Sequence, residues 1–479
     1  MWGDTGLKSQ GDISMLQRLR LIRPSLSTSA VCCRKSDAPR LGVRIVLAMA
    51  GIALASPSLA TNGYFQIGYG AKSTGMAGAA VANPQDTLAA AANPAGMAYV
   101  GEGFDIGLRL FSPMREGTLD CTGFGCSQAI SSTSANQLFA IPDGGYVQKI
   151  NDKMYAGVSL YGNGGMNTSY GTNIYAEAAF QSGFPPLPGP QPPGAGTAVF
   201  GELGVNLAQF MIAPTLTYNI TENQTIGISP VFAIQRFQAK GLGLFAGLSA
   251  DPTMLTNNGA DYSYGAGVRI GWLGKLAPGI KLGATYATKT YMTKFEEYSG
   301  LFADSGSFDI PANAAIGIAV EPVDKLTVAA DVQRIFYGDV ESIANPGPTA
   351  AEFGGTISPD RKLGASNGIG FGWQDTWNFK LGVKYELTKA WTLRAGYNYG
   401  QSPIPTSEVL INILAPGVVE NHATLGFSYR SSKSSQWNVS YMHAFYNSES
   451  DPSTSFAGMP AEISMYQNAV NISYSRTFD

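Results

Sequence analysis

Residues Tyr262 to Trp272 read YSYGAGVRIGW, and this stretch decides the fold. Apolar or aromatic side chains occupy every even position, whereas serine, glycine and arginine occupy the odd positions. Alternation with a period of two is typical of a β-strand with one apolar and one polar face. The stretch Trp377 to Leu387 repeats the pattern, and Trp391 to Tyr399, Ala423 to Tyr429 and Val470 to Phe478 resemble it. The chain therefore contains many strands with two unlike faces.

The composition indicates where the apolar faces point. Charged residues make up 14% of the 479 residues, against roughly 25% in average soluble domains. There are 58 glycines and 23 tyrosines, yet the mean hydropathy is +0.00. A membrane helix needs about 20 consecutive apolar residues, and the longest apolar stretch, Ile45 to Ala55, is shorter than that. A dispersed apolar signal of this kind is typical of a transmembrane β-barrel.

The connections between the expected strands alternate between short and long. Fourteen candidate strands begin near Phe104, Gln137, Met154, Gly204, Thr225, Tyr262, Ile280, Asp309, Leu326, Thr376, Trp391, Asn421, Gln436 and Ile463. Short turns are expected at 151–152, 221–224, 276–279, 321–325, 388–390 and 431–435, with long loops at 165–203, 239–260, 292–308 and 339–375. Outer-membrane barrels have short turns at one end and long loops at the other. We therefore predict an all-β fold, a transmembrane antiparallel β-barrel of about 14 strands.

The N-terminus predicts export. Arg40 and Arg44 precede the apolar stretch Ile45 to Ala55, and Ser58-Leu59-Ala60 has the small-x-small pattern of a cleavage site. Residues 1–60 are therefore expected to be a signal peptide with a long leader, and the mature chain to begin at Thr61; a short buried helix is the alternative. Cleavage leaves 23 basic against 31 acidic residues, which argues against nucleic acid as a partner.

Two cysteines remain in the mature chain. Cys121 and Cys126 enclose a short glycine-containing segment, and in an exported protein such a pair predicts a disulfide. A metal site would need further ligands, and the chain contains only two histidines, His422 and His443. We therefore expect neither a metal nor another cofactor.

Residues 61–100 precede the expected barrel, 101–479, and are not strand-like. Small residues dominate, and a helical stretch is expected around Gln85 to Ala92, ending at Asn93-Pro94. A compact segment of small residues in this position is suited to fill the lumen as a plug. A disordered leader is the alternative, although Met76, Val81 and Leu88 would give the segment a packing face.

This segment also carries a family resemblance. The run GYGAKSTGMAG from Gly68 to Gly78, continued by Pro84-Gln85-Asp86 and by Asn93-Pro94-Ala95-Gly96-Met97, resembles the FadL-type family of long-chain fatty-acid transporters, which includes channels for aromatic hydrocarbons. The resemblance implies a plugged fourteen-stranded barrel in the bacterial outer membrane that takes up hydrophobic small molecules. Outer-membrane lipid, lipopolysaccharide and the outer-membrane insertion machinery are the other expected partners, and we expect a monomer.

The resemblance further implies a route for the substrate. A ligand would be captured on two extracellular loops, bound inside the barrel, and released sideways where the third strand, Met154 to Gly165, kinks beside the plug. Glycines in that strand permit a bulge or a bend, although a plain strand end is equally compatible. We expect Asn93 to bond the third strand; the gate residues would be Asn93, Pro94, Ala95, Tyr161, Gly162, Gly164 and Gly165.

Apolar side chains in two long loops are the candidate capture site, because exposed apolar patches usually bind something. They are Leu242, Leu244, Phe245, Leu248, Met254 and Leu255 in one loop and Phe295, Tyr298, Leu301 and Phe302 in the next. Packing of the loops on each other explains them equally well. A carboxylate substrate would also need a cation inside the barrel, for which Arg269 and Lys384 are candidates among several lysines and arginines on the polar strand faces.

Other functions find less support in the sequence. Gly364-Ala365-Ser366-Asn367-Gly368 matches the hydrolase pattern G-x-S-x-G, but it lies in a long polar loop rather than between a strand and a helix. An outer-membrane hydrolase is therefore disfavoured, and we expect no enzyme activity. A general diffusion porin is the alternative transport function, and a plug argues against it because it would block aqueous flow.

Overall fold

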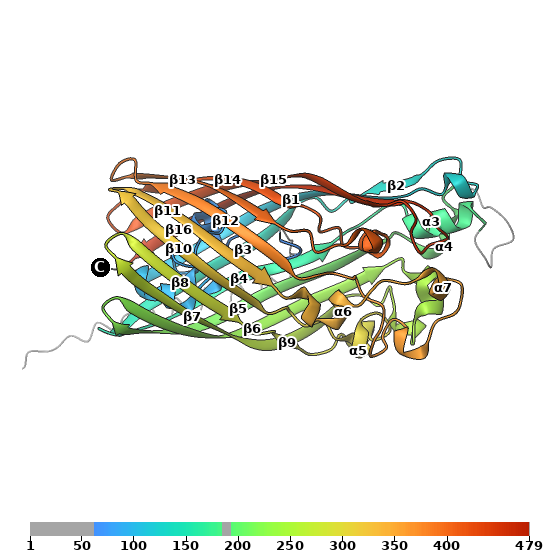
Figure 1. Cartoon of the computed structure of the whole chain (residues 1–479), viewed down its shortest axis with the longest axis horizontal. Helices are drawn as coiled ribbons and strands as arrows, with labels where there is room; N and C mark the ends of the chain where they lie inside the picture. The colour runs from blue at the N-terminus through green and yellow to red at the C-terminus, as the bar shows by residue number, and fades with distance from the viewer. Residues whose placement is uncertain (1–61, 184–192, 479) are drawn as a thin grey trace, which may run out of the picture. The chain divides into compact units, whose positions relative to one another are not determined.

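The computed structural model describes residues 62–183 and 193–478, and within them the strands form one closed antiparallel barrel (Figure 1). The first strand, β1 (Gly103–Leu119), pairs with β3 (Phe139–Asn151) on one side and with the last strand, β16 (Ala461–Thr477), on the other. That second pairing closes the sheet, so no strand of the wall is left as an edge. The predicted signal peptide, 1–60, lies outside the described residues.

The wall has the fourteen strands that the alternation predicted. They are β1, β3 and β16, together with β4 (Met154–Asn167), β5 (Gly204–Thr221), β6 (Gln224–Lys240), β7 (Asp261–Ala277), β8 (Ile280–Ala287), β10 (Asn313–Val323), β11 (Leu326–Ile335), β12 (Thr376–Tyr385), β13 (Trp391–Gly400), β14 (Asn421–Arg430) and β15 (Ser435–Asp451). Two short strands, β2 (Ile130–Thr133) and β9 (Tyr291–Met292), lie beside β1 and β7. The strand expected near Asp309 begins at Asn313.

The long loops at one end of the barrel contain short helices, whereas the other end has only tight turns (Figure 1). The loop helices are η4 (Thr122–Phe124), α3 (Ile174–Gln181), α4 (Ala195–Phe200), η5 (Gly243–Leu248), η6 (Pro252–Met254), η7 (Glu296–Tyr298), α5 (Ala303–Gly306), η8 (Tyr337–Asp339), α6 (Glu341–Ala344), α7 (Ala350–Phe353), η9 (Pro359–Arg361), η10 (Thr406–Glu408) and α8 (Val409–Asn412). The predicted disulfide between Cys121 and Cys126 is formed in the first long loop.

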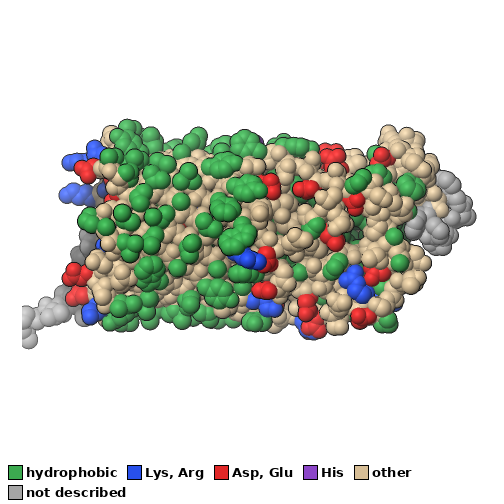
Figure 2. Space-filling view, in the orientation of Figure 1, with side chains coloured by type: hydrophobic (Ala, Val, Ile, Leu, Met, Phe, Trp, Pro, Cys, Tyr) green, Lys and Arg blue, Asp and Glu red, His purple; other side chains and the backbone are tan. Residues whose placement is uncertain are grey.

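The apolar strand faces point outward. Ile106, Leu108 and Leu110 of β1 are each about two-fifths exposed, whereas the intervening Arg109 is buried. Figure 2 shows hydrophobic side chains covering the strand region of this face, with charged side chains gathered towards its two ends. Among the described helices, none combines the length and the apolar character needed to cross a membrane. An outward apolar band with polar ends is what a bilayer-spanning barrel presents.

Residues 62–100 lie inside the barrel, and we call them the plug (Figure 1, blue). They contain α2 (Gly70–Thr74), η2 (Ala89–Ala91) and η3 (Pro94–Tyr99). The helix expected over Gln85 to Ala92 is wrong, because only a 3₁₀ turn forms there and the α-helical turn comes earlier. Packing against the wall overrides the high helix propensity of the alanines, as tertiary contacts commonly do.

Inward-facing glycines let the plug backbone approach the wall closely. A Cβ on Gly164 of β4 would lie 1.6 Å from the Tyr64 carbonyl oxygen, and one on Gly271 of β7 would lie 1.9 Å from the Asn93 side-chain oxygen. Glycine is the residue used where two backbones approach so closely. Further wall glycines that meet the plug in this way are Gly145, Gly157, Gly227, Gly283, Gly382, Gly396 and Gly426.

Candidate functional site

The ladder between β3 and β4 stops halfway along the two strands. Their pairing runs from Asn151 opposite Met154 to Gly144 opposite Leu160 and no further. Beyond that point β3 pairs only with β1, and β4 pairs only with β5 and the plug. The wall therefore lacks direct backbone hydrogen bonds between residues 139–143 and 161–167.

At this interruption β4 is bulged. Its register with β5 shifts between Gly162 and Gly164, so that Asn163 is the extra residue. The predicted bend of the third strand is thus confirmed as a β-bulge, a device that kinks a strand locally. Tyr161 packs inward against Tyr69 of the plug, with 4.6 Å between the ring centroids.

The plug supplies the hydrogen bonds that β3 does not. The Gln66 side chain donates to the Gly162 carbonyl at 2.8 Å, and the Gln66 amide donates to the Asn163 carbonyl at 3.2 Å. The Gly165 amide donates to the Tyr64 carbonyl at 3.3 Å. Backbone groups near lipid must be bonded within the protein, and here the plug bonds them. The sequence identified the bulge, but it did not identify residues 64–66 as its partner.

Asn93, by contrast, lies away from the bulge. Its side-chain oxygen caps η3 by accepting from the Ala95 amide at 3.0 Å. Its side-chain nitrogen donates to the carbonyls of Val81, at 2.9 Å, and of Trp272 in β7, at 3.0 Å. The expected contact with the third strand is therefore wrong. Pro94 and Ala95 contact the inner side of Gly227 in β6. These two residues therefore also pack against the wall at a place other than the β4 bulge.

The two apolar loops bury their side chains against each other. The Phe302 ring lies 4.6 Å from that of Phe237 and 4.7 Å from that of Phe308, and the Tyr298 hydroxyl accepts from the Ala239 amide at 3.1 Å. The expected exposed capture patch is not present in this arrangement, and the packing alternative is correct. The fully buried members are Leu242, Phe245, Leu248, Leu255, Phe295, Tyr298 and Phe302, whereas Leu244, Met254 and Leu301 are half-buried.

The two candidate cations lie away from this loop cluster. Arg269 contacts the Asn313 side-chain oxygen at 3.3 Å and the Ala92 carbonyl of the plug at 3.5 Å. Lys384 pairs with Glu386 at 3.3 Å near a short turn. Arg269 therefore helps to hold the plug, whereas Lys384 lies near a short turn at the end of the barrel. The structure does not bring the two cations together as one carboxylate site.

Charged groups on the wall also hold the plug in place. The Asp331 carboxylate accepts from the Ala80 and Val81 amides at 2.8 and 3.0 Å, and Lys380 donates to the Ile67 carbonyl at 3.0 Å. Inside the plug, burial and the nearby Asp105 carboxylate raise the pKa of Asp86 to about 7. Charge-assisted hydrogen bonds of this kind are stronger than neutral ones, so the plug is firmly held.

A small cavity lies beside the bulge, between the plug and β1. Its volume is about 20 Å³, and its lining includes Tyr64, Asn167, Trp373 and the buried Arg115. Arg115 was not predicted to be a site residue. It falls on the polar face of β1, in phase with Asp105 and Arg109, and that alternation could have identified it.

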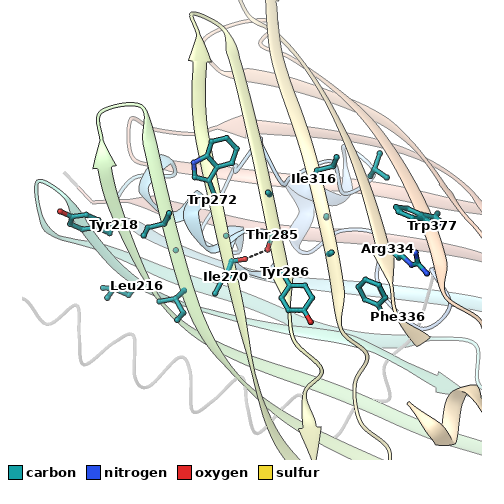
Figure 3. A pocket seen from close by; sticks show the side chains of 18 residues that line it. Leu216, Tyr218, Ile270, Trp272, Thr285, Tyr286, Ile316, Arg334, Phe336 and Trp377 are labelled. Atoms are coloured by element: carbon teal, nitrogen blue, oxygen red, sulfur yellow. Dashed lines mark hydrogen bonds between the residues drawn. The ribbon is translucent and has the colours of Figure 1, made fainter. Parts of the chain in front are cut away.

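A large hollow lies on the outside of the wall. It encloses about 1130 Å³ in front of strands β5 to β8 and β10 to β12, and outward side chains such as Ile270, Tyr286 and Trp377 line it. Figure 3 shows these side chains on the strands with the plug behind them. Its lining belongs to the outward, apolar strand faces, so the hollow is distinct from the lumen.

The rival sites have no structural support. Ser366 lies in the long loop after η9, without the strand-turn-helix context of a nucleophile elbow. Within residues 62–183 and 193–478, no three His, Cys, Asp or Glu side chains gather to form a metal-binding group.

Known proteins resemble the chain in sequence and in fold. Residues 199–478, more than half of the chain, match a family described as outer membrane protein transport protein (OMPP1/FadL/TodX). Crystal structures of the P. putida toluene transporter TodX and of a Pseudomonas aeruginosa FadL homologue each align with a TM-score of 0.61, at 20% and 17% identity. These alignments cover 86% and 87% of the chain and 99% and 100% of the two structures.

A third solved structure, the Ralstonia pickettii toluene transporter TbuX, aligns with a TM-score of 0.57 at 19% identity, covering 86% of the chain and 99% of that structure. At these identities the likeness establishes the fold. None of the curated protein sequences matches the chain significantly.

Proposed function

The chain belongs to the OMPP1/FadL/TodX family of outer-membrane transport proteins, and on this premise we propose that it takes up hydrophobic small molecules and releases them sideways into the membrane beside the β4 bulge. Fatty acids and aromatic hydrocarbons are the substrate classes. The observation that carries the proposal is the interrupted β3–β4 ladder, where the plug bonds β4.

Sideways release is favourable for an apolar solute. Each CH₂ group that stays in hydrocarbon instead of entering water is worth about 0.8 kcal/mol. At the interruption the Cγ2 atom of Ile141 in β3 lies 2.7 Å from where a Cβ of Gly162 in β4 would be. Moving side chains there breaks no hydrogen bond between β3 and β4, because residues 139–143 and 161–167 make none with each other.

Entry requires the loops to separate. In the described arrangement residues 242–255 and 295–308 bury their apolar side chains, and the Gly300 amide of one loop donates to the Met254 carbonyl of the other. Opening exposes those same apolar side chains, so a hydrophobic compound arriving from outside would meet them first. The cluster is therefore proposed as a capture site in its open form and as a cover in its closed form.

A disulfide across the interruption tests sideways release. The Cγ2 atom of Ile141, whose place a cysteine sulfur can take, lies 2.7 Å from a Cβ at Gly162, so the Ile141→Cys/Gly162→Cys variant brings the two thiols within reach of a disulfide. Uptake of labelled toluene and of labelled oleate is measured in cells that lack their own transporter, before and after reduction. We expect the oxidised variant to lose at least tenfold in uptake rate and the reduced variant to recover.

The two single-cysteine variants control for the substitutions and for reduction of the Cys121–Cys126 bond. If the oxidised double variant transports at the wild-type rate, release occurs elsewhere and an axial path past the plug replaces the sideways route. If the wild-type protein itself takes up neither compound, the proposed function is wrong.

A further inference from the structure

We propose that Pro214 of β5 and Pro230 of β6 form a hinge in the wall that lets β4 move away from β3, so that these two prolines are positioning residues for sideways release. The inference rests on the proposed function and names the part of the wall that bends during release.

Pro214 and Pro230 lie directly opposite each other in neighbouring strands. Ile212 pairs with Phe232 on one side of them, and the ladder resumes in the same register at Leu216 on the other side. Proline has no N–H group, so neither residue can donate to the carbonyl of the other. The three residues centred on Pro214 accordingly have no ladder partner in β6.

Side-chain hydroxyls replace part of the missing ladder on the inner side of the wall. Thr215 and Ser229 are both buried, and their hydroxyl oxygens lie 2.5 Å apart. The Thr215 hydroxyl also donates to the Ala213 carbonyl of its own strand at 3.0 Å. Side chains can rotate apart without unpairing a strand, so this link holds the closed wall and still allows it to bend.

The proline pair lies at the height where β4 loses its ladder with β3. Leu160 is the last β4 residue that pairs with β3, and its β5 neighbour is Ile212, two residues from Pro214. On the loop side of this height β4 keeps its ladder with β5 and has none with β3. β4 can therefore leave β3 only together with β5, and this ribbon bends most easily where β5 is not bonded to β6.

Prolines are concentrated in this part of the wall. The fourteen wall strands contain five prolines, which are Pro113, Pro142, Pro214, Pro230 and Pro322. Pro142 lies in the stretch of β3 that has no ladder with β4, so three of the five belong to strands at or beside the interruption. Proline is disfavoured in central strands because it removes a ladder bond. Strands β3 to β6 therefore give up ladder stability, as segments that move commonly do.

Valine in place of the prolines tests the hinge, because it should raise stability and lower transport together. Pro214→Val/Pro230→Val restores both donors, and valine favours strands. In nanodiscs, two further ladder bonds should slow hydrogen exchange of residues 161–167 about tenfold and raise the unfolding temperature. Uptake of labelled toluene and of labelled oleate, expressed per folded barrel in cells that lack their own transporter, should fall by a similar factor.

Pro113→Val is the matched control, because Pro113 pairs with Gln467 of β16 and lies outside strands β3 to β6. It should leave both uptake and the exchange of residues 161–167 unchanged.

Thr215→Val changes the hinge in the opposite direction. It removes the hydroxyl link to Ser229 and keeps both prolines, so exchange of residues 161–167 should become faster while uptake per folded barrel does not fall. This single substitution keeps the test decisive if the double valine variant does not fold. Slower exchange or lower uptake in Thr215→Val would contradict the hinge.

A double valine variant that is more stable and still transports at the wild-type rate would overturn the hinge. Unchanged exchange of residues 161–167 in that variant, or an equal loss of uptake in Pro113→Val, would overturn it as well. The tethered Ile141→Cys/Gly162→Cys variant tests sideways release separately, so the proposed function can stand when the hinge fails. Uptake of neither compound by the wild-type protein would contradict the proposed function itself.

Discussion

The side-chain nitrogen of Asn93 in the plug donates a 3.0 Å hydrogen bond to the backbone carbonyl of Trp272 in β7. The same side chain donates to the Val81 carbonyl and caps η3 through the Ala95 amide. One buried amide thus joins two parts of the plug to the wall. Its loss removes the hydrogen bonds to both carbonyls and the cap of η3.

Replacing Asn93 should loosen the plug without preventing barrel assembly. Each buried group left unbonded costs about 1–3 kcal/mol, so in Asn93→Ala the plug amides should exchange hydrogen at least tenfold faster, as measured by mass spectrometry. Asn93→Asp keeps the cap but sets a buried carboxylate oxygen against the two carbonyls, so exchange at least as fast as in Asn93→Ala is expected. Unchanged exchange in Asn93→Ala would show that these bonds do not hold the plug.

The same contact can be broken from the wall. A Cβ on Gly271 would lie 1.9 Å from the Asn93 side-chain oxygen, so Gly271→Ala should displace Asn93 and raise plug exchange as Asn93→Ala does. Gly171→Ala is the matched control, because nothing lies within 4 Å of its added Cβ. Equal effects of the two alanines, or no effect of either, would contradict the close fit between the plug and the wall.

The stability of the plug should depend on pH through Asp86. Burial and the Asp105 carboxylate raise its pKa from 3.8 to about 7, so the folded plug binds this proton more tightly than the unfolded chain. Its contribution to stability is therefore greatest below about pH 4 and declines as the pH rises towards 7. Hydrogen exchange corrected for intrinsic rates should show this trend, and Asp86→Asn should flatten it. An identical trend in the variant would assign the titration to another group.

The loop cluster should behave as a packed cover when closed. Phe302 is 3% exposed among Phe237, Phe295 and Phe308, so Phe302→Ala should cost about 3–5 kcal/mol of local stability. External protease should then cleave the loops of intact cells faster. Phe124→Ala, in a different loop and 40% exposed, should not change cleavage. Weaker ligand binding with unchanged cleavage in Phe302→Ala would instead favour an open capture surface.

The strands could be predicted because the alternation of apolar and polar residues is visible within each strand's own sequence. Tyr264, Val268 and Ile270 alternate with glycine and arginine whatever the rest of the chain does, and a closed barrel keeps that alternation facing lipid. The bulge in β4 was equally local, since Gly162, Gly164 and Gly165 mark it. These local features were recovered, whereas the equally local helix expected over Gln85 to Ala92 was overridden by packing against the wall.

The contacts of the plug could not be predicted because their partners lie far away in sequence. Asn93 bonds Trp272, 179 residues later, and no local pattern distinguishes β7 from β4 as its neighbour. Whether Phe295 is exposed likewise depends on Phe237, which comes from a different segment. Arg115 was within reach, because it continues the inward face of β1, but its hydrogen-bond partners Ser134, Asn136 and Asn167 lie in later segments of the chain.

The close fit between plug and wall has a consequence for the order of assembly. The plug backbone meets wall glycines on β3, β4, β6, β7, β8, β12, β13 and β14, strands spread over most of the sheet. A plug that contacts the wall on so many sides cannot be inserted into a barrel that has already closed. It must be in place while the sheet is still open, and the pairing of β1 with β16 then encloses it. The last ladder to form therefore decides whether the barrel closes plugged or empty.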